Sequence, residues 1–403
     1  MRRIAWSLFT AAVFCLGSPA FARAGTVIMN PDRVEQDALP SNPIAAMQAA
    51  RQRVASGDLD RAVRDLAGYV FYHPGEIGPE RLLGDLYYRQ GNLAKAEAAY
   101  KHILTYAPAD KETHNRLGSV FATENRIDEA IAEFNRSLPG TDSVPDLVRL
   151  HLIKGDFARY RKEREKAAED FPSDAESQLE LGQVYEAVHQ PELAIRYFKR
   201  ALDADANSVA AMSGLGLAYL DESRLAEATT QFQQCLTKDS FNYACLNNLG
   251  ATFLQGSRWN AAASVLDSAH KLQPERSEAL VNLGYLADSK GDWKGAIVYY
   301  VDAMTVYPYS PDAYIDLGYT YNVHGLYQLA QAALIKGLAV APQDGRLHYL
   351  LGETYQREGN DVLAKAQFTA AAGADDLDPD VKRLAQQRVA TLNGTTPKQK
   401  PIP

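Results

Sequence analysis

The sequence predicts an all-α fold, an α-solenoid of about ten helical hairpins that ends in a capping helix. Two observations lead to this prediction. A Leu-Gly pair recurs at one fixed spacing, and the single wider interval, from Gly118 to Gly182, fits one full unit and one shorter unit. Further columns of residues keep the same phase as these glycines. The glycines of the pair are Gly84, Gly118, Gly182, Gly216, Gly250, Gly284, Gly318 and Gly352.

Two of these columns combine small side chains with large ones. An alanine follows each glycine at a constant offset, as Ala96 follows Gly84, and a large apolar or aromatic residue follows that alanine one helical turn later, as Tyr100 does. The alanines are Ala96, Ala130, Ala194, Ala228, Ala262, Ala296, Ala330 and Ala364. The large residues are Tyr100, Phe134, Phe198, Phe232, Leu266, Tyr300, Leu334 and Phe368. Within each half of a unit the large residues lie three or four apart, which places them on one face of a helix.

The glycine column indicates that two helices approach each other closely. A glycine inside a helix costs about 1 kcal/mol relative to alanine, and close packing of antiparallel helices offsets that cost. Residues suited to a left-handed helix end divide each unit into two halves, and prolines close the second half. The dividing residues are Gly57, Gly91, Asn125, Gly291, Gly325 and Gly359, with His189, Ser223 and Ser257 as weaker stops. The closing prolines are Pro74, Pro108, Pro274, Pro308 and Pro342.

Residues 1–24 read as a secretory signal peptide. Arg2 and Arg3 precede an apolar run from Ile4 to Leu16, and small residues follow, with cleavage expected after Ala22 or Ala24. The alternative is an uncleaved N-terminal anchor. Cleavage removes three arginines and no acidic residue, so the formal charge moves from −8 to −11. A chain this acidic is a poor ligand for nucleic acid, and no later segment is apolar enough to span a membrane.

The remaining elements follow in chain order. Residues 25–42 form a leader, residues 43–140 the first three units, residues 141–174 a degenerate fourth unit and residues 175–378 units five to ten. Residues 379–393 form an amphipathic helix that starts at an Asp378 N-cap and caps the array, and residues 394–403 form a disordered tail. In the fourth unit Tyr160 occupies the alanine column, so we expect its helices to spread. We also expect a local kink or an altered superhelical pitch there, which divides units one to three from units five to ten.

The columns L-G-x-x-Y, Ala, aromatic and Pro resemble the tetratricopeptide repeat over residues 43–378. This resemblance implies a right-handed superhelix whose concave side is lined by the first helix of each unit. It also implies a protein that binds peptides or protein partners. Function should then lie in residues that point inward without supporting the fold.

The residue before each Leu-Gly is one such column, and in three consecutive units it is Asn248, Asn282 and Asp316. An asparagine side chain both donates and accepts hydrogen bonds, so a row of them can bind the backbone of an extended peptide. Tyr285 and Tyr319 stand beside this row, with Asn247, Asn322 and Tyr349 one turn away. These eight residues form the predicted peptide-binding site. The alternative is that they pack against the next helix. Arg81, Arg89 and Arg116 at equivalent positions of units two and three could accept an acidic ligand.

The predicted function is that of a secreted or periplasmic, non-catalytic scaffold that binds an extended peptide or protein partner. The alternative is a structural subunit of a cell-envelope machine, such as polysaccharide export or pilus assembly. The sequence has no H-E-x-x-H, Cys-x-x-Cys or P-loop motif, so we expect no catalytic residues, no metal and no cofactor. Cys235 and Cys245 remain after cleavage, and the sequence leaves open whether they form a disulfide or stay as two buried thiols.

Overall fold

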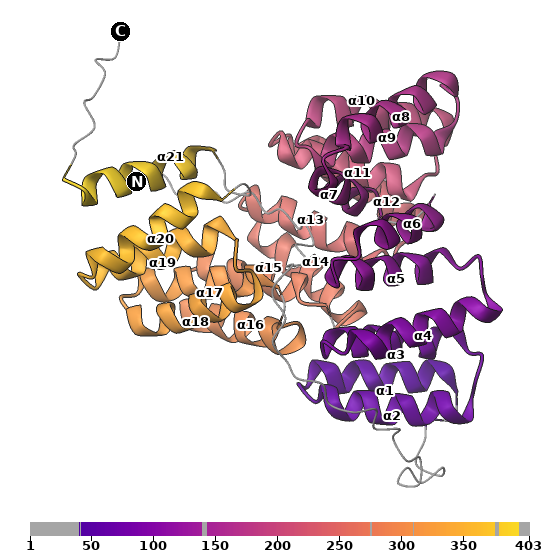
Figure 1. Cartoon of the computed structure of the whole chain (residues 1–403), viewed down its shortest axis with the longest axis horizontal. Coiled ribbons are helices and arrows are strands. Elements are labelled where there is room, and N and C mark those ends of the chain that lie inside the picture. Colours follow the sequence, from indigo (N-terminus) through magenta and orange to yellow (C-terminus); the bar gives the residue numbers. More distant parts are fainter. Residues whose placement is uncertain are drawn as a thin grey trace. The chain divides into compact units, whose positions relative to one another are not determined.

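A computed structural model describes residues 40, 42–138, 143–274, 276–308, 310–374 and 379–394. Within these ranges the chain forms 21 α-helices and no strand, which confirms the all-α prediction (Figure 1). None of the helices in the described ranges has the length and apolar character needed to cross a membrane. The predicted signal peptide, most of the leader, the Asp378 cap and nearly all of the C-terminal tail lie outside the described residues.

The helices fall into two compact units, and the boundary between them lies at Glu275 and Arg276. Unit 1 contains seven hairpins. Their helices are α1 (Pro43–Ala55), α2 (Leu59–Tyr72), α3 (Ile77–Arg89), α4 (Leu93–Tyr106), α5 (Lys111–Thr123), α6 (Ile127–Ser137), α7 (Val144–Lys154), α8 (Phe157–Asp170), α9 (Ala175–Ala187), α10 (Pro191–Ala204), α11 (Val209–Asp221), α12 (Leu225–Lys238), α13 (Tyr243–Gln255) and α14 (Trp259–Leu272).

Unit 2 contains three hairpins and a final helix that packs on the last hairpin. Its helices are α15 (Glu278–Ser289), α16 (Trp293–Val306), α17 (Pro311–Val323), α18 (Tyr327–Val340), α19 (Gly345–Arg357), α20 (Asp361–Gly373) and α21 (Pro379–Leu392). In α21 the side chains of Val381 and Ala385 are buried, so one face of this helix covers the end of the hairpin stack.

The repeated small residues mark the tightest contacts of each hairpin. All eight alanines of the alanine column are 0% exposed. A Cβ atom added to Gly84 would lie 2.5 Å from Tyr100, and one added to Gly284 would lie 2.5 Å from Tyr300. Each of the other six glycines likewise faces the large residue of its own hairpin. The glycine therefore makes room for one particular side chain of the partner helix.

The turn inside each hairpin takes the left-handed conformation that the sequence predicts. Gly57, Gly91, Gly291, Gly325 and Gly359 have φ between 71° and 86°. Asn125, His189, Ser223 and Ser257 occupy the same turn position with φ between 56° and 60°. These four residues carry a Cβ in a region that favours glycine, so their turns are strained.

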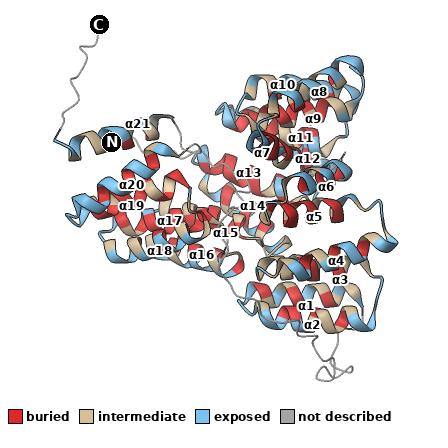
Figure 2. Ribbon diagram, in the orientation of Figure 1, coloured by how far each residue is buried: buried red, intermediate tan, exposed pale blue. Residues whose placement is uncertain are grey.

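The hairpins stack so that the first helices contact one another within each unit, as α9 with α11 and α15 with α17. Each second helix contacts its own first helix and the first helix of the next hairpin, as α10 contacts α9 and α11, and the second helices form an outer layer. Buried residues run as stripes along the helices, between these two layers (Figure 2). The first helices thus supply the inner face of each unit and the second helices its outer face.

The fourth hairpin differs from its neighbours as its sequence suggests. Tyr160 on α8 is buried and stacks on the ring of His151 on α7, with ring centroids 4.4 Å apart. The two helices touch over a much smaller stretch than the helices of the hairpins on either side. A large ring in the alanine column accounts for this separation. The kink expected at this hairpin stays a prediction.

Candidate functional site

The eight predicted site residues lie on first helices of both units. Asn247 and Asn248 lie on α13 of unit 1, whereas the other six lie on α15, α17 and α19 of unit 2. Each group is therefore described within its own unit. In unit 2 the structure brings its six residues onto three successive helices, because α15 packs against α17 and α17 against α19.

The accessible part of the site is the inner face of α15 and α17. Asp316 and Tyr319 lie three residues apart on α17, so they share one helix face, and Asn282 and Tyr285 take the equivalent positions on α15. Tyr319 is 40% exposed, and Asp316 and Tyr285 are partly exposed. Asn282 is buried. Two tyrosines and one carboxylate thus form the surface that a ligand could reach.

Asp316 lies in acidic surroundings. Burial raises the pKa of its carboxyl to about 8, and the charges of Asp312 and Asp288 raise it further than Arg346 lowers it. Burial also raises the pKa of Asp312, although Arg346 opposes this effect. Asp316 therefore lies near two further carboxyl groups, Asp312 of α17 and Asp288 of α15, and near one guanidinium.

Arg346 on α19 is the cation of this cluster, and it joins α17 to α19. Its Nη1 donates to Asp312 at 2.9 Å and its Nη2 to Asp344 at 2.8 Å. On the other side, the Thr320 hydroxyl donates to Asp288 at 2.5 Å and so joins α17 to α15. Sequence reasoning missed these contacts. A signal was present, because Asp312 and Arg346 occupy the same column of two consecutive repeats.

Asn322 and Tyr349 belong to the packing of the hairpins. The Asn322 side-chain amide donates to Thr354 Oγ1 at 2.8 Å and to the Leu350 carbonyl at 3.5 Å, which holds α17 against α19. Tyr349 is buried, and its ring lies 5.5 Å from that of Phe368 on α20. Both side chains support the fold, which the sequence did not reveal. Their part in binding stays a prediction.

The asparagines of unit 1 are also buried. Asn247 and Asn248 lie within α13, and the Asn247 amide donates to the Asn248 side chain at 3.4 Å. Together with the burial of Asn282, this means that the predicted asparagine row presents little polar surface to solvent. The role of these three residues as peptide ligands stays a prediction.

The arginines of the second and third hairpins are already paired within the chain. Arg81 binds Asp110 through two hydrogen bonds of 2.8 and 2.9 Å. Arg116 contacts Asp85 at 3.1 Å and Glu112 at 2.9 Å. Because carboxylates already neutralise both guanidinium groups, an acidic ligand would have to compete with these pairs, and its binding at the two residues stays a prediction.

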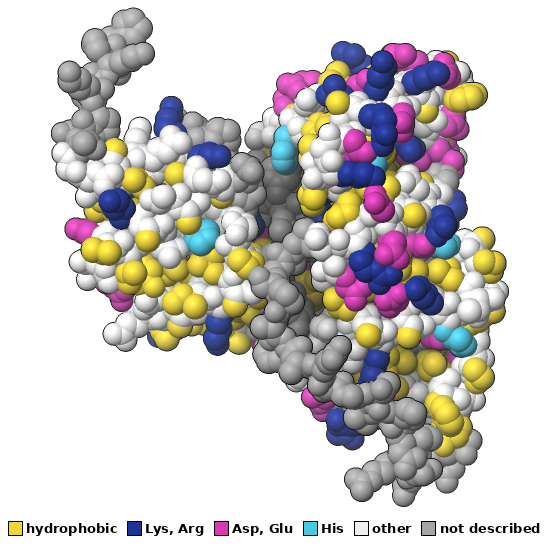
Figure 3. Space-filling view, in the orientation of Figure 1, with side chains coloured by type: hydrophobic (Ala, Val, Ile, Leu, Met, Phe, Trp, Pro, Cys, Tyr) yellow, Lys and Arg dark blue, Asp and Glu magenta, His cyan; other side chains and the backbone are white. Residues whose placement is uncertain are grey.

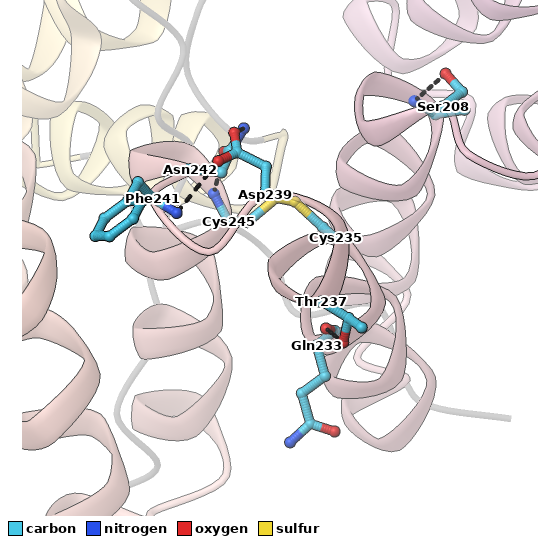
Figure 4. Close-up of a disulfide and its surroundings, with 9 residues drawn as sticks. Ser208, Gln233, Cys235, Thr237, Asp239, Phe241, Asn242 and Cys245 are labelled. Carbon is cyan, nitrogen blue, oxygen red and sulfur yellow. Dashed lines mark hydrogen bonds between the residues drawn. A yellow bond between two sulfur atoms is a disulfide. The ribbon is translucent and has the colours of Figure 1, made fainter.

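Cys235 and Cys245 form a disulfide, which resolves the alternative that the sequence left open. Cys235 lies near the end of α12 and Cys245 near the start of α13, with 6.4 Å between their Cα atoms. The Asn242 side chain accepts a hydrogen bond from the Cys245 backbone at 3.0 Å and so caps α13 (Figure 4). The bridge and the cap together fix the connection between the sixth and seventh hairpins.

Stacked helical hairpins with this column pattern define an all-α repeat protein whose function lies on its surfaces. The tetratricopeptide repeat family model matches residues 81–145, 179–243 and 247–311. The chain belongs to the tetratricopeptide repeat family.

Solved structures of low sequence identity share this fold. The Cut9–Hcn1 hetero-tetramer of the APC/C matches at 16% identity with a TM-score of 0.50, over 86% of this chain and 90% of the other. A tetratricopeptide repeat protein from Parabacteroides merdae matches at 14% identity with a TM-score of 0.50, over 61% of this chain and 98% of the other. At these identities the likeness establishes the fold alone.

Proposed function

We propose that this protein is a non-catalytic scaffold of the periplasm, or is secreted, and that it binds an extended segment of a protein partner along the inner face of unit 2. The observation that carries this proposal is the exposure of Tyr319 beside the partly exposed Tyr285 and Asp316. A tyrosine offers a rigid apolar ring with a polar tip, and such residues dominate binding energy at protein interfaces.

The charges around Tyr319 favour a segment with a basic side chain. Asp288, Asp312 and Asp316 outnumber Arg346, which Asp344 also binds. A lysine or arginine from the partner would offset the repulsion among these carboxylates. It would also lower the pKa of Asp316 by favouring its ionised form.

Two features support export of the chain. Residues 1–24 have the order of charges, apolar residues and small residues of a signal peptide. The Cys235–Cys245 disulfide fits an oxidising compartment. The N-terminus of the protein purified from cells tests this part of the proposal. A protein that begins at residue 23 or 25 would support it, whereas an intact Met1 together with recovery in the cytoplasm would overturn it.

A photoreactive residue at position 319 tests the binding surface. Illumination of intact cells should crosslink it to one defined protein, and Asp316→Asn should reduce the yield. The matched control is a photoreactive residue at Tyr72, which is 37% exposed at the end of the second helix of the first hairpin. Equal capture from both positions would overturn the proposal. Capture within a permanent, membrane-associated assembly would instead support the alternative of a structural subunit of an envelope machine.

A further inference from the structure

The outer faces of the two units differ in charge. On α10 of unit 1, Glu192, Arg196 and Arg200 form an exposed stripe of three charges. At the equivalent positions on α16 of unit 2 stand Lys294, Val298 and Asp302, with Val298 57% exposed. On α18, Leu329 is 51% and Ile335 47% exposed. Figure 3 shows hydrophobic side chains gathered over α16 and α18, and interleaved acidic and basic ones over α8 to α10. The outer face of unit 2 thus exposes apolar side chains to water, which is unfavourable and is typical of an interaction surface.

The two charges of the α16 stripe have no ion-pair partner among the described residues. Lys294 and Asp302 are both exposed, and the Lys294 ammonium lies 5.6 Å from the ring centroid of its neighbour Trp293. The equivalent residues of α6 differ, because Asp128 pairs with Lys154 and Arg136 with Glu133. The α16 stripe therefore carries one positive and one negative charge that remain available to another molecule.

We propose that the outer face of α16 and α18 binds the same face of a second copy of this chain. Lys294 and Asp302 lie four residues before and four after Val298, about 6 Å to either side along the helix axis. A two-fold axis at Val298 would place two α16 helices antiparallel. Lys294 of each copy would then lie level with Asp302 of the other. The stripe is complementary to itself, as a two-fold interface requires.

The exposed residues of α18 are also spaced symmetrically about one residue. On α18, Leu329 and Ile335 lie three residues before and three after Ala332, which is the counterpart of Val298 in the repeat. The same two-fold axis would bring Leu329 of one copy level with Ile335 of the other. The large exposed hydrophobic side chains of α18 would then cover each other, while Lys336 would lie level with the uncharged Gln328. Two adjacent helices thus fit a second copy.

The corresponding contact is disfavoured on α10 of unit 1. Glu192 and Arg200 would also lie level with each other in an antiparallel pair. Their midpoint, however, is Arg196, so two like charges would meet on the symmetry axis. Val298 removes that repulsion in unit 2 and adds apolar contact.

The size of the face indicates how strong the association is. Two helices of 14 residues are each about 21 Å long and about 10 Å wide, so their outer surfaces together cover about 400 Å² per copy. Specific interfaces bury about 800 Å² per partner. The dimer should therefore depend on concentration and dissociate on dilution.

Sedimentation equilibrium of the full chain over a concentration series tests the proposal. The weight-average mass should rise toward twice that of one chain. Asp302→Lys or Lys294→Asp alone should weaken association at least about tenfold, because each change places like charges together at two symmetric positions. The double variant K294D/D302K should restore it. Glu192→Lys, at the position of Lys294 on α10, is the matched control and should have no effect.

Three outcomes would overturn the proposal, provided that circular dichroism shows each variant folded. The first is a monomer at every concentration. The second is a dimer that Val298→Arg and the single charge reversals leave unchanged, since another face would then be responsible. The third is a chain that sediments with anionic phospholipid vesicles in a manner that Val298→Asp abolishes, because the face would then meet a membrane.

Discussion

The two units build the same hairpin and use its free positions differently. In unit 1 the first helices, which supply the inner face, hold balanced ion pairs, such as Arg81 with Asp110 and Arg116 with Asp85. In unit 2 the inner face gathers carboxylates around Asp316, and the outer face replaces charges with Val298, Leu329 and Ile335. The residues that close each hairpin are nevertheless the same in both units. The difference shows that the repeat determines how the two helices of each hairpin pack, whereas the residues on the surface differ between unit 1 and unit 2.

The largest effect that we predict should be the same in both units. Gly84→Ala in unit 1 and Gly284→Ala in unit 2 would each place a Cβ atom 2.5 Å from a buried tyrosine ring. We expect each to lower the free energy of unfolding by about 3 kcal/mol, as measured by urea denaturation. Gly373→Ala on α20 is the control, because nothing lies within 4 Å of its Cβ position. It should instead stabilise the protein by about 0.5–1 kcal/mol. A loss of stability in only one of the two variants would show that the hairpins of the two units do not pack in the same way.

The packing of this fold could be predicted from sequence because each hairpin repeats a local rule. The residues of the glycine, alanine and turn columns lie close in sequence within one hairpin, so their spacing alone predicts which residues are in contact. The structure adds which side chain each glycine admits. It also shows that Ser223 and Ser257 adopt the same left-handed turn as the glycines.

The chemistry of the site could not be predicted in the same way, because it depends on contacts between hairpins. Asn322 donates to Thr354, 32 residues later, and Asp312 pairs with Arg346. The pKa of Asp316 depends on residues of three helices. A sequence column shows which residues are equivalent. It does not show whether their side chains are exposed on the inner face or packed against the next helix.

The disulfide should distinguish the two units by stability. It closes a short loop, because Cys235 and Cys245 are 10 positions apart in the sequence, and for such a loop chain entropy gives about 2–3 kcal/mol. Replacing both cysteines by alanine should therefore speed amide hydrogen exchange in α12 and α13 of unit 1. Exchange in α17 and α19 of unit 2 should stay unchanged. Faster exchange throughout both units would show that they unfold as one body.

The raised pKa of Asp316 predicts a pH dependence located in unit 2. The unfolded carboxyl loses its proton near its ordinary value of 3.8 and the folded one at about 8, so ionisation opposes folding between these values. The stability of the wild-type protein should fall relative to Asp316→Asn as pH rises from 4 to 8. The gap should reach about 1–2 kcal/mol, since the carboxyl is partly exposed and solvent screens part of the penalty.

A substitution in unit 1 tests that assignment. There burial raises the pKa of Asp221 to about 6, so the gap between wild type and Asp221→Asn should stop growing near pH 6. A gap for Asp316→Asn that stays constant from pH 4 to 8 would contradict the raised pKa.

The smallest effect concerns the residue at the left-handed turn of the hairpins, which differs between the two units. Unit 2 has glycine at the left-handed turn of all three hairpins, whereas Ser223 and Ser257 hold φ of 56° in unit 1. Ser257→Gly should raise the free energy of unfolding by about 0.5–1 kcal/mol, because glycine adopts this conformation without strain. Gly325→Ser in unit 2 should lower it by a similar amount. Thermal unfolding of the two variants gives the comparison, and shifts of the same sign would show that the turns are not equivalent.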